Sequence, residues 1–154
     1  MARKAQAALE YLMTYGWAIL LVIVVVGALY ATGMLKPCRW TGLQAKEFPL
    51  SEVKVVPVRL TSNELVFEVY YQQAGDATLN DVTITGTADG QTVTLGSETV
   101  SSTTFSSNNA VTVTVPITGA SSGACAVFNI VLNYTKPGTT QYSLASGRIE
   151  GPVS

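Results

Sequence analysis

Glu10 is the first residue whose position suggests a chemical role, because it is the only charged residue between Lys4 and Lys36. It stands directly before an uncharged run that starts at Tyr11. An unpaired charge is costly in an apolar environment. A carboxylate at this point therefore either stays in water at the edge of the apolar segment or takes a cationic partner, and the residues alone leave both roles open.

Cys38 and Cys125 are the two cysteines of the sequence and a second possible site of chemistry. Two cysteines in a domain outside the cell are expected to form a disulfide. This bond would tie the region just after the apolar run to the start of an apolar strand and would close a loop of nearly 90 residues. Two free buried thiols are the alternative.

The residue types and patterns of common catalytic sites are missing. The sequence has no histidine, which is the commonest general base near neutral pH and the commonest metal ligand. It contains no glycine-rich phosphate loop and no CxxC pair, and its acids are scattered. The formal net charge of −1 gives no basic footprint for a nucleic acid. We therefore expect no enzyme activity, no metal, no cofactor and no nucleic-acid partner.

The uncharged run over residues 11–35 predicts an element of membrane length. Its 25 residues would form a helix of about 37 Å, longer than a bilayer core of about 30 Å. The β-branched stretch VIVVV weakens a helix in water, but in lipid a helix satisfies every backbone hydrogen bond. Gly33 and Pro37 are stop signals, which predict that the helix ends at Thr32-Gly33.

The short basic leader favours a cytoplasmic N-terminus and a C-terminal domain outside the cell, since Arg3 and Lys4 precede the run. An ordinary secretory signal peptide is the alternative. Its apolar region would be about 7–15 residues long, which is shorter than the run found here.

The N-terminal residues read Arg3-Lys4-Ala5-Gln6-Ala7-Ala8-Leu9-Glu10-Tyr11. Followed by the apolar run, they resemble the start of an archaeal type IV pilin, a member of the type IV pilin superfamily with a class III signal peptide. In that family a short basic leader ends in a small residue before Gln-x-Ser-x-Glu, and prepilin peptidase cuts on the cytoplasmic side. The resemblance implies a leader at 1–5, a cut between Ala5 and Gln6, and a mature helix at 6–35. Ala8 departs from the pattern, which prefers serine.

The same resemblance implies that Glu10 acts in assembly. Cleavage gives Gln6 a new α-amine, which can meet Glu10 of a neighbouring subunit when subunits stack with an axial offset. In the dry core of a filament this pair would set the stagger. The implied assembly residues are Gln6, Glu10 and Tyr11. The implied partners are further copies in a helical homopolymer, prepilin peptidase, the pilus assembly machinery and, before assembly, the membrane.

After Pro37 the hydrophobic pattern changes to an alternation with period two, which is typical of β-strands. We interpret 36–50 as a linker and 51–154 as a head domain. Strands are predicted at 53–60, 65–72, 81–88, 91–97, 110–117, 126–134 and 140–146. Seven short strands in about 100 residues are typical of an immunoglobulin-like β-sandwich. The expected fold class is α+β, with a long N-terminal hydrophobic helix followed by an all-β head.

Three further positions carry specific expectations. Asp89-Gly90 between two alternating runs predicts a tight hairpin. Pro57 falls inside the first predicted strand, so that strand is expected to be an edge strand or to contain a bulge. Asn133-Tyr134-Thr135 is an Asn-x-Ser/Thr sequon, which makes Asn133 a possible site of N-glycosylation.

These observations predict a structural filament subunit at the cell surface, held before assembly as a single-pass membrane protein. The alternative is a single-pass surface protein whose β-sandwich binds a ligand without polymerising. Gln6 and Glu10 favour the filament, since a plain anchor requires neither residue.

Overall fold

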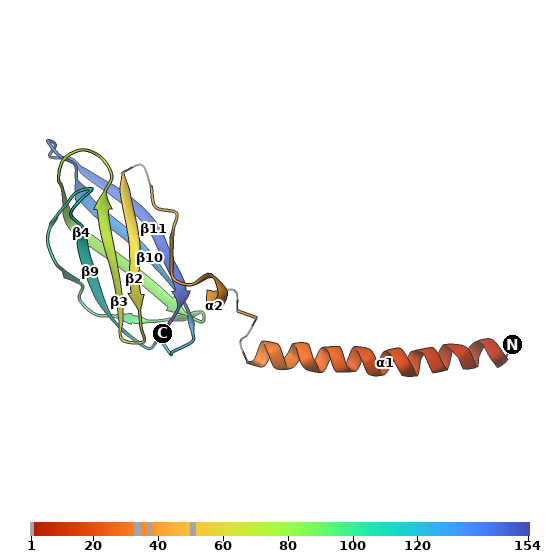
Figure 1. The fold of residues 1–154 in the computed structure, drawn as a ribbon. Helices are drawn as coiled ribbons and strands as arrows, with labels where there is room; N and C mark the ends of the chain where they lie inside the picture. The colour runs from red at the N-terminus through yellow and green to blue at the C-terminus, as the bar shows by residue number, and fades with distance from the viewer. Residues whose placement is uncertain (1, 33–34, 37, 50–51) are drawn as a thin grey trace. The chain divides into compact units, whose positions relative to one another are not determined.

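The computed structural model describes residues 2–32, 35–36, 38–49 and 52–154, and the side chains of residues 2–9, 12 and 39 lie outside this description. The chain divides between residues 36 and 37 into two compact units. The first unit is a helix and the second is a β-rich head (Figure 1). One apolar helix followed by a domain of antiparallel strands confirms the expected α+β class.

Helix α1 runs without interruption over Ala2–Ala31. Its segment Met13–Ala31 has 19 residues with a mean hydropathy of 2.1, and none of this segment is buried within the protein. This is long and apolar enough to span a membrane or to be a signal sequence.

Thr32 closes the C-terminal end of α1. Its backbone N–H donates to the Ala28 carbonyl at 3.0 Å, and its hydroxyl donates to the Leu29 carbonyl at 3.0 Å. These two bonds satisfy carbonyls that a helix end otherwise leaves open. The predicted stop at Gly33 lies outside the described residues.

Within its described residues, the head contains one short helix, α2, and two antiparallel sheets. Sheet I has the strand order β1-β11-β10-β4-β5 with β8 paired to β4, and sheet II has the order β2-β3-β9-β6 with β7 paired to β9. The elements are α2 Cys38–Thr41, β1 Gln44–Lys46, β2 Val53–Leu60, β3 Glu64–Tyr71, β4 Ala77–Ala88, β5 Gln91–Thr92, β6 Thr94–Leu95, β7 Thr99–Val100, β8 Thr104–Phe105, β9 Val111–Thr118, β10 Cys125–Thr135 and β11 Tyr142–Pro152.

The two sheets lie in two layers around one hydrophobic core (Figure 1). Successive side chains of a strand point to opposite faces, so every second residue faces the core. Strand β10 follows this rule over its whole length: its core-facing side chains are at most 1% exposed. They are Ala126, Phe128, Ile130, Leu132 and Tyr134.

Residues 38–49 belong to the head, so the prediction of a linker over 36–50 is wrong for most of that range. The segment contains α2 and β1, and β1 pairs with the edge of β11. Phe48 is 7% exposed and is part of the core. The short length of β1 explains the error, because three residues show no periodicity.

Two glycines of β11 accommodate this segment on the inner face of sheet I. A Cβ atom on Gly147 would lie 2.5 Å from the ring of Phe48, and one on Gly151 would lie 2.7 Å from the Cα of Leu43. Both distances are too short for any side chain. Phe48 and Leu43 therefore occupy space that exists because these two strand positions carry no side chain.

Most of the predicted strands are present. β2, β3, β9 and β10 agree with prediction to within one residue at each end, whereas β4 starts earlier and β11 continues further. The predicted strand 91–97 is instead split, since β5 pairs with β4 in sheet I and β6 pairs with β9 in sheet II. The chain crosses between the sheets at Val93, which is 4% exposed.

Both local details predicted for the head are confirmed. Asp89 and Gly90 have φ angles of 49° and 81°, and positive φ at both central residues is what a two-residue type I′ hairpin requires. Strand β2 lies at the edge of sheet II. Its pairing with β3 shifts register between Pro57 and Arg59, as expected where a proline cannot donate a ladder hydrogen bond.

Candidate functional site

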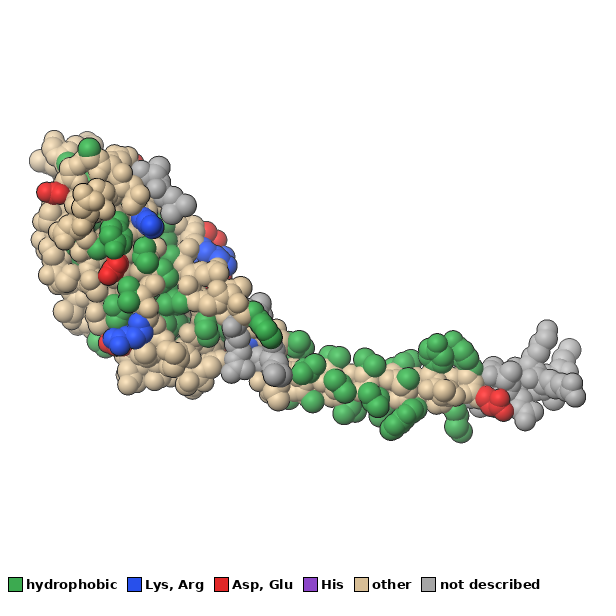
Figure 2. Space-filling model, in the orientation of Figure 1, with side chains coloured by type: hydrophobic (Ala, Val, Ile, Leu, Met, Phe, Trp, Pro, Cys, Tyr) green, Lys and Arg blue, Asp and Glu red, His purple; other side chains and the backbone are tan. Residues whose placement is uncertain are grey.

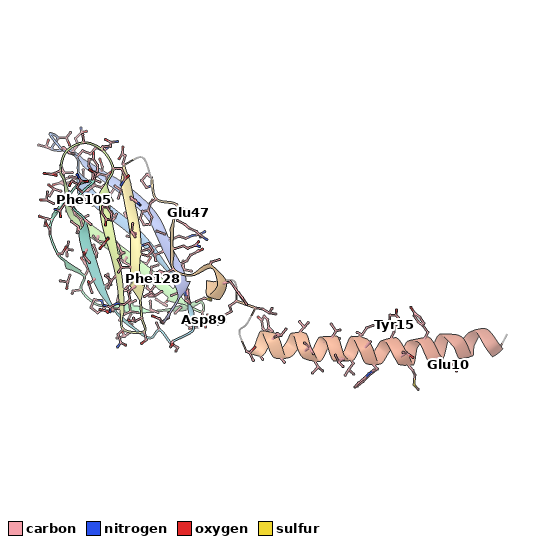
Figure 3. The ribbon with its side chains drawn as sticks, in the orientation of Figure 1. Glu10, Tyr15, Glu47, Asp89, Phe105 and Phe128 are labelled. Carbon is pink, nitrogen blue, oxygen red and sulfur yellow. A yellow bond between two sulfur atoms is a disulfide. The ribbon has the colours of Figure 1, made fainter. Side chains whose placement is uncertain are left out.

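Glu10 lies on the surface of α1, three residues before the apolar segment starts at Met13 (Figure 3). The hydroxyl of Thr14, one turn later, donates to the Glu10 backbone carbonyl at 2.9 Å. This bond uses the backbone of Glu10 and leaves its carboxylate available. Figure 2 shows apolar side chains along the described part of this helix, with an acidic side chain at the end of that part.

Two tyrosines continue the surface next to Glu10. The rings of Tyr11 and Tyr15 stack with centroids 4.4 Å apart and an angle of 24° between their planes. They are 63% and 54% exposed, and Trp17 is 67% exposed. Amphipathic aromatic rings gather at membrane–water interfaces, so this end of α1 has the side chains expected at such a surface.

Ala5 and Gln6 are both in the helical part of the chain, because α1 starts at Ala2. Gln6 precedes Glu10 by four residues, which is about one turn or 6 Å along the helix axis. Residues four apart lie on one helix face. A new α-amine at Gln6 would therefore lie on the same face of the helix as Glu10.

Two glycines in α1 lie on its open surface. A Cβ atom on Gly16 or Gly27 would meet no other atom within 4 Å. The two glycines are 11 residues apart, and 11 residues at 100° each end about 20° from three full turns. Gly16 and Gly27 thus share a face where a second helix could approach closely.

Cys38 of α2 and Cys125 of β10 form a disulfide, with Cα atoms 5.9 Å apart and a sequence separation of 87 residues. This is the pairing expected from the sequence. Strand β10 lies between β11 and β4 in sheet I. The bond therefore joins the start of the head to an interior strand of this sheet.

The hairpin turn after β4 is attached to the same cysteine (Figure 3). The backbone N–H of Asp89 donates to the Cys125 carbonyl at 2.9 Å, and the backbone N–H of Cys125 donates to the Asp89 carboxylate at 3.1 Å. The disulfide, the turn and the start of β10 thus meet at one junction.

A buried tyrosine and an ion pair meet at Glu52. The Tyr134 hydroxyl donates to one carboxylate oxygen at 2.5 Å, and the Lys136 ammonium pairs with the other at 2.7 Å. Burial raises the pKa of Tyr134, whose ring packs edge-on against Tyr71 and Phe105. The hydrogen bonds from Lys136 and Tyr134 lower the pKa of Glu52. This cluster was missed from the sequence, because 82 residues separate Glu52 from Tyr134.

A Glu52→Gln variant is expected to be less stable than the wild type at neutral pH but not at strongly acidic pH. A carboxylate with a lowered pKa in the folded state stabilises the protein above its unfolded pKa, and this contribution is lost as pH falls through the folded pKa. We expect the free energy of unfolding at neutral pH to fall by on the order of 1 kcal/mol. Denaturant titrations at both pH values check this, with the exposed Glu98→Gln as the matched control. An equal loss at both pH values would contradict it.

Asn133, the possible glycosylation site, lies in β10 opposite Leu144 of β11 and Asp81 of β4. Its flanking residues Leu132 and Tyr134 are fully buried, so the Asn133 side chain is on the outer face of sheet I. The structure therefore places the sequon within a strand.

Two shallow hollows lie beside Asn129 in the head, with volumes of about 350 and 220 Å³. The larger is lined by threonines and apolar residues without a charged side chain. Within the described residues, no group of three or more His, Cys, Asp or Glu could hold a metal ion. The smaller hollow is lined in part by the polar side chains of Glu47, Asn129 and Ser146.

The chain was also compared with known proteins. No protein-family model matches the chain, and no curated protein matches it. Its function is therefore inferred from the residues described above.

Proposed function

We propose that this chain is a pilin, the structural subunit of an archaeal type IV pilus-like filament outside the cell. Before assembly, α1 holds the subunit in the membrane with its N-terminus in the cytoplasm. After cleavage between Ala5 and Gln6, α1 moves from lipid into the helical core of the filament, and the head faces outward. Both surroundings suit a helix that is apolar on all sides.

The observation that carries this proposal is Glu10, which lies three residues before Met13–Ala31, an exposed segment of α1 that has no charged residue. A membrane anchor gives the apolar residues their surroundings but gives the carboxylate no use. A neighbouring subunit with a free amine at Gln6 would supply apolar surroundings for the helix and a cationic partner for the Glu10 carboxylate. Gly16 and Gly27 support the same conclusion, because small residues on one face of a helix allow a second helix to approach closely.

We also propose that the head is an immunoglobulin-like β-sandwich. That fold has strands A, B, E and D in one sheet and C, F and G in the other. If β2 is taken as strand A, the order β2-β3-β9-β6 corresponds to A-B-E-D, and β11-β10-β4 corresponds to G-F-C. The head differs from antibody domains in its disulfide, since Cys125 bonds to Cys38 rather than to a residue of the opposite sheet.

Negative-stain electron microscopy of sheared surface material, with peptide mass mapping of the filaments, tests this proposal. We expect thin filaments in which this chain is the main protein. Recovery of the chain only as single copies in the membrane fraction would support the alternative of a ligand-binding surface protein.

We predict that the membrane and filament forms begin at Gln6. The two bases and Ala5 directly before the Gln-x-x-x-Glu pattern mark the cut implied by the resemblance to pilins. Mass spectrometry of the N-terminal peptide measures this directly. A mature protein that retains Met1 or Ala2 would contradict both this prediction and the pilin proposal.

A further inference from the structure

Three exposed apolar side chains lie together on the outer face of sheet I. Val131 is 37% exposed, Tyr142 is 72% exposed and Leu144 is 69% exposed. Leu144 is the direct cross-strand partner of Asn133, and Tyr142 is the partner of Thr135. Val131 precedes Asn133 by two residues and so projects from the same face. We call Val131, Tyr142 and Leu144 the apolar strip.

Asn133 lies in the middle of the apolar strip with its amide unengaged. Among the described residues, its side-chain oxygen is enclosed without a hydrogen-bond partner. Directly opposite residues of an antiparallel pair have Cβ atoms about 4.5–5.5 Å apart. The nitrogen of the sequon is therefore next to Leu144.

We propose that Asn133 carries an N-linked glycan whose first sugars cover the apolar strip. Neighbouring exposed apolar side chains can form a contact surface, and the sequon in the middle of the apolar strip makes a glycan the occupant that we propose. The face of a sugar ring is lined by C–H groups, and a ring bonded to Asn133 lies within reach of Leu144. The glycan would remove the strip from water without a second protein. This inference rests on the extracellular location in the proposed function, but not on polymerisation.

The modification is a substitution at one carbon atom. The Asn133 amide nitrogen forms a bond to the anomeric carbon of a lipid-phosphate-linked oligosaccharide. The bond between that carbon and the phosphate oxygen breaks, and the lipid phosphate leaves with the electron pair. The amide nitrogen loses one proton, which passes to the leaving lipid phosphate or to water, and nothing is oxidised or reduced.

The fold requires that the sugar is attached before β10 is paired. Asn133 has a strand partner on each side, and Tyr134 is fully buried. The Thr135 hydroxyl, the third element of the sequon, accepts a hydrogen bond from the Asn80 amide at 2.9 Å. A transferase cannot bind a sequon held in this way, so attachment precedes folding of the head.

Glycopeptide mapping of the full-length protein from its own host tests the attachment. We expect a sugar mass on the peptide containing Asn133 and its complete loss in Asn133→Gln. Thr135→Ser, which preserves the sequon, should retain the sugar. An unmodified Asn133 in both the membrane and filament pools would overturn the proposal, even if filaments form. A glycosylated chain that forms no filaments would overturn only the pilin proposal.

Hydroxyl-radical footprinting tests whether the glycan covers the strip. In Asn133→Gln we expect several-fold faster oxidation of Tyr142 and Leu144 than in the glycosylated wild type. Val58, which is 54% exposed on sheet II, is the internal control and should react equally in both. The fully buried Leu132 should stay protected in both, which shows that the fold is intact. Unchanged rates at Tyr142 and Leu144 would overturn the covering role.

Discussion

A Glu10→Gln variant should insert into the membrane as well as the wild type but yield almost no filaments. Insertion is unaffected or slightly improved, since the edge of the apolar segment loses a charge. In the filament core, the amine of Gln6 on the neighbouring subunit would lose its partner. Removing one member of a buried ion pair costs about 3–5 kcal/mol, which corresponds to a roughly 10²–10⁴-fold weaker contact. Every subunit of the filament would bear this cost.

The experiment compares membrane-bound and sheared-filament pools of wild type and variant, with processing checked by mass. Glu10→Asp keeps the charge on a shorter side chain and should restore part of the yield. Thr14→Ala removes only a hydroxyl that bonds within the same helix, so it is the matched control and should assemble normally. A processed Glu10→Gln protein with normal filament yield would show that Glu10 only marks the edge of the apolar segment.

The sequence predicted the parts of the fold that are set by periodicity. Strand β10 alternates core-facing and outward residues over its full length, and its predicted range 126–134 differs from the structure by one residue at each end. Asp89-Gly90 was equally informative, because few residues adopt positive φ without strain. In such segments the residue types that form the local pattern also determine the structure: alternating apolar residues face the core, and residues that tolerate positive φ form the turn.

The sequence did not predict segments whose structure depends on distant residues. The ring of Phe48 fills the space that Gly147 leaves by having no side chain. The two residues are far apart in the sequence, and neither of them indicates this contact by itself. The strand predicted at 91–97 changes sheets at Val93, although its alternation continues through the crossing. Strands β7 and β8 have two residues each, which is too short for any period.

The residues of the candidate site also fall into those that the sequence predicted and those that depend on tertiary contacts. Glu10 and the cysteine pair stand out in the sequence because each is rare in its surroundings. The Glu52 cluster does not, because it depends on β10 placing Tyr134 beside a residue 82 positions away. The apolar strip was also missed, since the exposure of Leu144 depends on which face of β11 is covered.

The double variant Cys38→Ser/Cys125→Ser should lower the free energy of unfolding of the head by about 4–5 kcal/mol. In the chain-entropy model a disulfide stabilises by restricting the unfolded chain, and the effect grows with the length of the closed loop. The loop here spans 87 residues, near the upper end of the range where this model is applied. Denaturant titration of the oxidised wild type and the double variant measures the loss.

The loss should be uneven across the head. Without the disulfide, α2 loses its covalent link to β10, and residues 38–49 are held to the sheet by non-covalent contacts. Among these are the pairing of β1 with β11, the Lys46–Glu150 ion pair and the contacts of Leu43 and Phe48. Hydrogen exchange should therefore rise most at β1. The start of β10 should change less, because Cys125 keeps its two backbone bonds to Asp89.

Reduction of the wild type should reproduce the behaviour of the double variant, and the same reductant should leave the double variant unchanged. This comparison separates the bond from the effect of the serine side chains. Two freely alkylated thiols in the native protein would contradict the disulfide itself. An intact bond whose removal leaves the denaturation midpoint unchanged would instead mean that the head does not depend on this covalent link. The non-covalent contacts of residues 38–49, including the β1–β11 pairing and the packing of Phe48, would then be enough to hold this segment in place.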